Sequence, residues 1–178
     1  MDPYLNRVFQ DGVQVSYGRY KNLRDLLCRS RLPPIRPVRL LPGWRTCLKR
    51  CVACVYSSNM THFKCTASGR TFKISSTLTC TDHNVVYIIQ CKKCRAQYVG
   101  KTSGTFKARI NHHRNSIGQS SSGVARHFES IGHKVSDFMA FAIEKVAGDA
   151  FVLAVRERFW IDKLDVISAG INTYRTNV

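Results

Sequence analysis

A short run of β-branched and aromatic residues near the middle of the chain limits its fold most. Residues 85–89 read VVYII, a pattern that is typical of a buried strand. A second short apolar stretch, QYVG at 97–100, follows after the segment CKKCRA. Because this connection is short, we expect the two stretches to form an antiparallel hairpin whose turn carries a Cys-x-x-Cys.

Helical spacing dominates the residues after this hairpin. Residues 105–117 carry apolar side chains at helical intervals, with Ser103 as the expected N-cap and Gly118 as a stop signal. Residues 124–131 predict a second, shorter helix. Between the helices of the chain, residues 137–146 (DFMAFAIEKV) predict a third strand that is buried on both faces.

The last expected element is a helix over residues 149–164. We expect its apolar side to include Phe151, Val155 and Trp160. The predicted order of elements is therefore β-β-α-α-β-α. This order indicates the α/β fold class in the mixed α+β sense: a small sandwich in residues 84–178, with an antiparallel hairpin packed against helices.

The residues before this domain differ from it in composition. Residues 1–45 are basic and include the proline-rich RLPPIRPVRLLPG, so we expect a linker with extended backbone. Within it, a short helix over residues 20–28 is expected just before the proline-rich stretch. Residues 46–83 are rich in cysteine and contain too few large apolar residues for a core of their own. We expect bound metal to supply the missing stability of this segment. Cys28 is expected to be a lone buried thiol.

The charge balance indicates a polyanionic partner. Lys and Arg number 28 against 11 Asp and Glu, which gives a net charge of +17. Such an excess favours nucleic acid, and DNA is the leading candidate. No apolar run approaches the roughly 18–20 residues that span a bilayer, so we expect no membrane segment. The first residues lack a signal-peptide pattern, so we expect the chain to stay inside the cell.

The cysteines favour metal binding. Eight cysteines in a reducing compartment are more naturally metal ligands than disulfides, which remain the alternative. Cys91 and Cys94 are spaced as a zinc knuckle, and His127 and His133 are candidates to complete a tetrahedral site. A second cluster lies upstream, with Cys80 as the first choice for its fourth ligand and His83 or Cys65 as alternatives. Its other expected ligands are Cys47, Cys51 and Cys54.

A one-metal phosphodiesterase needs a group that takes a proton from water, an anchor for the phosphate, a carboxylate for the metal and a cation near the developing charge. Tyr87 and Tyr98 lie on the two strands of the predicted hairpin, so their hydroxyls can converge. Arg109 and His113 are four residues apart and project from one face of a helix. Glu157 lies on the last predicted helix, and its carboxylate suits Mg²⁺.

These residues occur in the order and spacing of a known nuclease family. The sequence resembles the GIY-YIG family. The motifs that carry the resemblance are VVY at 85–87, YVG at 98–100, Lys101, Arg109-x-x-x-His113, Glu157 and Asn172. The first motif reads VVY rather than GIY. Because that glycine contributes backbone room and the tyrosine the chemistry, we expect activity to survive the change.

The resemblance implies a role for each of these residues. Tyr87 would be the general base or would orient the nucleophile, with Tyr98 and Lys101 assisting. Arg109 would hold the scissile phosphate, and His113 would orient or shuttle a proton. Glu157 would bind Mg²⁺ or Mn²⁺, and Asn172 would lie near the active site.

The flanking details resemble the endonuclease domain of Penelope-like retroelements. The segments VVYIIQCKKC, QYVGKT, VARHF and FWIDKL occur in that order, with two cysteines between the two tyrosine motifs. This resemblance implies a Cys-Cys-His-His zinc site made by Cys91, Cys94, His127 and His133. It also implies that the domain follows a reverse transcriptase in the full-length protein, with that polymerase or the element RNA as partners.

Together these features predict a metal-dependent DNA endonuclease that nicks target DNA in the nucleus for target-primed reverse transcription, with Mg²⁺ and Zn²⁺ as its metals. The alternatives are a non-catalytic or co-opted zinc-containing DNA-binding module, and a GIY-YIG repair nuclease that acts on branched DNA. The stretch from residue 92 to residue 114 is basic and has no acid, and we expect its cations to contact DNA. These cations are Lys92, Lys93, Arg95, Lys101, Lys107, Arg109 and Arg114.

Overall fold

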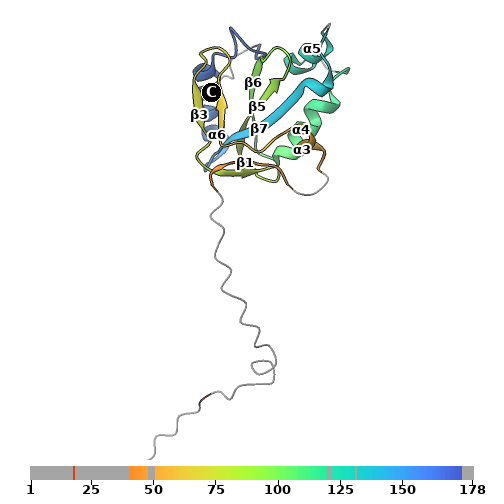
Figure 1. Cartoon of the computed structure of the whole chain (residues 1–178). Helices are drawn as coiled ribbons and strands as arrows, with labels where there is room; N and C mark the ends of the chain where they lie inside the picture. The colour runs from red at the N-terminus through yellow and green to blue at the C-terminus, as the bar shows by residue number, and fades with distance from the viewer. Residues whose placement is uncertain (1–17, 19–40, 48–50, 120–121, 131, 174–178) are drawn as a thin grey trace, which may run out of the picture. The chain divides into compact units, whose positions relative to one another are not determined.

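A computed structural model describes residue 18 and residues 41–47, 51–119, 122–130 and 132–173 (Figure 1). Most of the expected linker, the short helix over residues 20–28 and Cys28 lie outside the described residues. Among the helices that are described, none has the length and apolar character needed to cross a membrane.

A three-stranded antiparallel sheet forms the centre of the described structure. β5 (Val85–Cys91) lies between β6 (Gln97–Thr102) and β7 (Phe138–Lys145), so the strand order is β6-β5-β7 (Figure 1). All residues of β5 are buried, which confirms the buried-strand pattern of VVYII. The centre of the sheet therefore belongs to the core, and functional side chains must reach solvent from its edge strand or from the helices.

The β5–β6 hairpin places the two predicted catalytic tyrosines on one face of the sheet. Tyr87 lies opposite Gly100, and Ile89 lies opposite Tyr98. Because side chains alternate between faces along a strand, Tyr87, Ile89 and Tyr98 share a face. The pairing of β5 with β7 shifts its register between Val86 and Tyr87, so the ladder is irregular beside one of these tyrosines.

Three helices and one short 3₁₀ turn complete this part of the fold. α4 (Phe106–Asn115) and α5 (Gly123–Glu129) contact each other, and α6 (Ala150–Leu164) packs on β5 and β6. The 3₁₀ turn η1 (Val135–Asp137) leads directly into β7. The helix α6 thus packs on both strands of the hairpin, including β6, which carries the second tyrosine motif.

The N-cap of α4 is Thr105, and the prediction of Ser103 is wrong. The Thr105 hydroxyl accepts a hydrogen bond from the backbone N–H of Ala108. The helix begins at Phe106 because its first free N–H groups find partners in the upstream loop. Phe106 N donates to the carbonyl of Asp82, and the next N–H donates to the carbonyl of Cys80.

The buried side of α6 differs in part from the prediction. Trp160 is buried as expected, but Phe151 and Val155 are 63% and 42% exposed. Residues four apart lie on one face of a helix, so Phe151 and Val155 share the outer side, while Leu153 and Glu157 point inward. The side chain of Glu157 is therefore in the buried row of this helix, where a charge needs a partner.

The cysteine-rich segment packs as part of the same core. Together with residues 43–45, the end of the expected linker, it forms two small two-stranded sheets and a single helical turn: β1 (Gly43–Arg45) with β4 (Thr77–Thr79), β2 (His62–Lys64) with β3 (Thr71–Lys73), and α3 (Val52–Val55). Trp44 packs on Phe106 of α4, with ring centroids 4.5 Å apart, and Phe63 packs on Trp160 of α6. The segment therefore gains stability from a shared core, a source that its composition alone does not indicate.

Candidate active site

A cleft of about 540 Å³ opens between β6, α4, α5, α6 and the residues that follow α6. The predicted catalytic residues line it, with the exception of Tyr87. These lining residues are Tyr98, Lys101, Arg109, His113, Glu157 and Asn172. The fold thus brings together side chains from one strand, two helices and a loop, as a shared site requires.

Tyr87 lies directly beneath this cleft and connects two of its lining residues. Its side chain is fully buried. The Arg109 Nε donates a hydrogen bond to the Tyr87 hydroxyl over 3.1 Å, and His113 Nε2 lies 2.8 Å from the same oxygen. Because Arg109 can only donate, the phenol can accept from Arg109 and donate its own proton to His113. The hydroxyl therefore fixes the positions of both helical side chains.

Burial sets the protonation states of this group. It raises the pKa of Tyr87 well above its ordinary value, and the neighbouring Tyr98 adds to the effect. Burial also lowers the pKa of His113 to about 3, helped by the charge of Arg109, so the imidazole is neutral near pH 7. Burial opposes the charge of Arg109, but Tyr87 and Tyr98 outweigh it and raise the pKa of the guanidinium. The hydrogen-bonded group of Tyr87, Arg109 and His113 thus holds one cation, Arg109, beside neutral partners.

Gly100 makes room for the Tyr87 ring. A Cβ at this position would lie 2.6 Å from the Tyr87 hydroxyl oxygen and 2.8 Å from a ring carbon of Tyr98. Both distances are too short for real contacts, so a side chain here would displace one of the two phenols. The glycine of the second tyrosine motif is therefore needed for the position of the first tyrosine.

Glu157 supplies a buried carboxylate to the cleft. It is 7% exposed, and the Lys101 Nζ on β6 lies 3.5 Å from its Oε2. Among the described residues that line the cleft, Glu157 alone carries a carboxylate. A divalent ion such as Mg²⁺ needs one or two carboxylates and keeps several waters, so one carboxylate in an open cleft fits its requirements. Lys101 provides positive charge beside the same carboxylate.

Asn172 fixes the edge of β6. Its side-chain oxygen accepts from the Val99 N–H and its amide donates to the Val99 carbonyl, both over 2.9 Å. This pair of bonds replaces the missing neighbour strand at the edge of the sheet. Asn172 also lines the cleft, beside the other predicted site residues.

The sequence matches the family model of the GIY-YIG catalytic domain over residues 83–172, which is half of the chain. The chain belongs to the GIY-YIG family. It is therefore a nuclease, as the sequence motifs predict. None of the curated proteins matches the sequence.

Two solved structures are similar to this GIY-YIG domain. One is a mutant of the catalytic domain of intron endonuclease I-TevI, with 23% identity, a TM-score of 0.46, and coverage of 52% of this chain and 94% of that one. The other is the catalytic domain of homing endonuclease I-TevI, with 24% identity, a TM-score of 0.44, and coverage of 51% and 97%.

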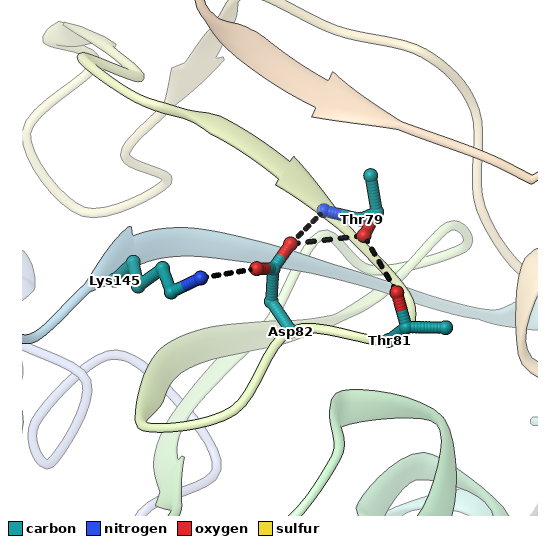
Figure 2. A network of polar contacts seen from close by, with 4 residues as sticks. All are labelled: Thr79, Thr81, Asp82 and Lys145. Atoms are coloured by element: carbon teal, nitrogen blue, oxygen red, sulfur yellow. Dashed lines mark hydrogen bonds and ion pairs between the residues drawn. The ribbon is translucent and has the colours of Figure 1, made fainter.

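The start of α4 in this GIY-YIG domain is held by the loop between β4 and β5. Figure 2 shows how Asp82 organises this loop: its Oδ2 accepts from the Thr79 N–H and hydroxyl, and its Oδ1 pairs with the Lys145 Nζ over 2.6 Å. Burial opposes the negative charge, but these partners lower the pKa of Asp82 overall. Since the loop carbonyls accept from the first N–H groups of α4, this network positions the helix that carries Arg109.

The upstream cysteine cluster lies beside the same loop. The sulfur atoms of its members lie within 4.8 Å of one another, and those of Cys47 and Cys54 are 3.5 Å apart. The fold brings Cys80 to this cluster and leaves both alternatives outside it. Cys65 donates its thiol to the Leu164 carbonyl, and His83 is exposed. The cluster consists of Cys47, Cys51, Cys54 and Cys80.

A second cluster joins the hairpin turn to α5. The Cys91 sulfur lies 3.3 Å from His133 Nδ1, and the Cys94 sulfur lies 3.5 Å from His127 Nε2. All four ligand atoms lie within 4.8 Å of one another. Two thiols and two imidazoles at this spacing suit tetrahedral zinc. A neighbouring lysine also connects the hairpin turn to the residues after α5, because Lys93 donates to the Gly132 carbonyl.

The cations predicted to contact DNA lie in three places: the cleft, the hairpin turn and the rest of α4. Lys101 and Arg109 line the cleft, whereas Lys92, Lys93 and Arg95 are exposed at the hairpin turn. Lys107 is exposed on α4, and Arg114 donates to the neighbouring Asn115 side chain. Two basic residues outside the predicted set, His112 and Arg126, do line the cleft. In the sequence, Arg126 directly precedes the predicted metal ligand His127. Adjacent side chains on a helix point about 100° apart, so this position could have indicated that Arg126 points in a different direction from the metal ligands.

Proposed function

We propose that this GIY-YIG domain is a metal-dependent DNA endonuclease that nicks one strand of its target. The observation that carries the proposal is the cleft itself. It combines the Arg109 guanidinium, the neutral His113 imidazole and the buried Glu157 carboxylate on one surface, with Tyr87 joining the first two from beneath. A phosphodiester in this cleft meets an anchor, hydrogen-bonding groups and a metal ligand at once.

Each side chain takes part in the reaction according to its position. Arg109 binds the scissile phosphate, since its Nε is held by Tyr87 and the guanidinium lines the cleft. We assign the orientation of the attacking water and the movement of its proton to the hydrogen-bonded pair of Tyr87 and His113, with Tyr98 assisting. Of the two roles that the family resemblance leaves for Tyr87, orientation fits its full burial better than direct contact with water.

Glu157 would hold Mg²⁺ or Mn²⁺, and the bound ion would stabilise negative charge on the phosphate and the leaving oxygen. Lys101 lies beside the same carboxylate and would add positive charge near the bound phosphate. Asn172 acts on the site through β6, because it holds the strand that carries both Tyr98 and Lys101.

Zinc is proposed for both cysteine clusters. The Cys91, Cys94, His127 and His133 set would join the hairpin turn to α5, and the four-cysteine set would join the upstream segment to the start of α4. Metal analysis of Cys91→Ser should show one zinc fewer per chain than the wild type. An unchanged zinc content would dismiss this ligand set.

The biological setting proposed for the nick is insertion of a Penelope-like retroelement. The support is the order of the motifs VVYIIQCKKC, QYVGKT, VARHF and FWIDKL together with a net charge of +17. In this setting the domain acts in the nucleus beside a reverse transcriptase and the element RNA. The free 3′ hydroxyl at the nick then primes DNA synthesis.

Plasmid nicking tests the proposal. Purified wild type with Mg²⁺ should convert supercoiled plasmid to the open circle, and Glu157→Gln should lose this activity because the metal ligand loses its charge. Asp162→Asn is a matched control, since Asp162 also lies on α6 but is not among the residues that line the cleft. Equal nicking by Glu157→Gln and the wild type would remove Glu157 from the site. Tight DNA binding without nicking by the wild type, with either metal, would favour the non-catalytic module instead.

A further inference from the structure

The α5 helix contributes a wall of the cleft that the catalytic roles above leave without a function. Its residues Gly123, Val124 and Arg126 line the cleft, and none of them has a role in the proposed reaction. Arg126 is exposed, and no side-chain hydrogen bond or ion pair of its guanidinium is found within the ranges that the structure describes. By contrast, the other two permanent cations of the cleft already have contacts, Arg109 with Tyr87 and Lys101 with Glu157.

The cleft has room for more than the reacting phosphate. At about 540 Å³ it is comparable with pockets that hold a whole drug-sized ligand. A single phosphate and a hydrated ion at Arg109 and Glu157 would leave much of this space to the adjoining part of the DNA strand. That part carries a further negative charge, which needs a positive group on the protein side.

Two contacts hold α5 in its place beside the cleft. At its start, Gly123 packs so closely on the loop after α6 that a Cβ would lie 2.7 Å from the Ile171 carbonyl oxygen. Near its end, His127 lies 3.5 Å from the Cys94 sulfur within the second metal-ligand cluster. Val124 and Arg126 lie between these contacts and line the cleft, and of the two Arg126 carries a charge. A short helix fixed at both ends presents a guanidinium at a defined position, which is what a specific phosphate contact needs.

We propose that Arg126 binds a DNA phosphate that neighbours the scissile one, so that the strand is held by two arginines from two helices. Arg109 on α4 binds the phosphate that reacts, and Arg126 on α5 fixes the direction of the strand through the cleft. This inference rests on the proposed function, because it assumes that DNA occupies the cleft. Since Arg126 contacts a group that does not react, it should contribute to binding of substrate and transition state alike.

The salt dependence of DNA binding tests the proposal. Each phosphate that a side chain neutralises contributes about 0.9 to the slope of log K against log salt for duplex DNA. Binding of a fluorescent duplex, measured by anisotropy with Glu157→Gln protein so that the DNA stays intact, should therefore lose about one unit of slope in Arg126→Ala. Arg126→Lys should keep most of the slope because it keeps the charge. Arg70→Ala, an equal loss of charge at an exposed turn that is not among the cleft-lining residues, should keep it too.

Nicking kinetics provide a second readout. In the background of active protein, Arg126→Ala should raise KM several-fold with little change in kcat, because it removes binding that is equal in both states. An unchanged slope in Arg126→Ala, an equal loss in Arg70→Ala, or a loss in Arg126→Lys as large as in Arg126→Ala would each overturn the proposal. Failure of the proposed function is distinguishable: a wild type that binds duplex DNA but never nicks it refutes the endonuclease, while the slope still decides the role of Arg126.

Discussion

Replacement of Gly100 by alanine tests whether the position of Tyr87 controls the site. The added Cβ would lie 2.6 Å from the Tyr87 hydroxyl oxygen and 2.7 Å from the ring carbon that bears it. Tyr87 is fully buried, so its ring cannot move into solvent to relieve the contact. The hydroxyl must therefore shift away from β6, which lengthens its hydrogen bonds to Arg109 and His113.

The expected cost has a stability part and an activity part. Extra volume in a tightly packed core costs about 1–3 kcal/mol, which lowers the melting temperature by roughly 2–4 °C per kcal/mol in a chain of this size. A displacement of about 1 Å of a positioning group can reduce the rate of reaction by about 10²-fold. We therefore expect Gly100→Ala to stay folded at 25 °C but to nick plasmid about a hundred times more slowly.

Gly104→Ala is the matched control for this experiment. A Cβ at Gly104 would meet nothing closer than the Thr102 hydroxyl at 3.7 Å, an ordinary contact. The two variants are compared by thermal melting and by the rate of plasmid nicking at a temperature where both are folded. If Gly100→Ala melts and nicks like Gly104→Ala, then the hydroxyl of Tyr87 does not set the geometry of the site.

Three further predictions follow from the residues that hold the cleft. Asp82→Asn should be less stable than the wild type at neutral pH, because its partners lower the pKa of Asp82 in the folded state. The difference in unfolding free energy should be complete above about pH 4 and should vanish as acid protonates the wild-type carboxyl. Urea unfolding at several pH values measures this trend. Asn172→Asp keeps the acceptor for the Val99 N–H but cannot donate to the Val99 carbonyl. Urea unfolding should therefore show an unfolding free energy lower by about 1–3 kcal/mol. An unchanged midpoint would contradict the role of Asn172 in holding β6. Zinc analysis should find one ion fewer in Cys80→Ser than in the wild type, and nicking should be reduced because α4 loses its anchor. The control Cys65→Ser should keep the full zinc content. Equal loss of zinc from both variants would refute the assignment of Cys80.

Local patterns in the sequence were sufficient for the elements that carry the site. The run VVYII and the stretch QYVG predict the β5–β6 hairpin, since strand propensity and a short connection are properties of neighbouring residues. The four-residue spacing of Arg109 and His113 likewise predicts that both lie on one side of α4, and both contact the Tyr87 hydroxyl. The family model confirms the nuclease family that these motifs indicate.

Features that depend on contacts between distant segments were not predictable in this way. The buried side of α6 depends on what the sheet offers, and apolar Phe151 lies on the outer side although its own hydrophobicity favours burial. The start of α4 depends on carbonyls in the loop after β4, which is why Thr105 rather than Ser103 caps the helix. That Tyr87 lies below the cleft, and that Arg126 lines it, both follow from the packing of β6 and α5 rather than from any local spacing.

The proposed function places a DNA phosphate and one divalent ion in one cleft, between Arg109 and Glu157. A crystal structure of the domain with uncleaved duplex DNA and Mn²⁺, with the metal located by its anomalous scattering, would show whether both bind there. We expect a single manganese peak bonded to a Glu157 carboxylate oxygen at about 2.0–2.3 Å, with the guanidinium of Arg109 on the same phosphate that contacts the ion. Manganese bound elsewhere, or DNA lying on a face that excludes both side chains, would contradict this placement.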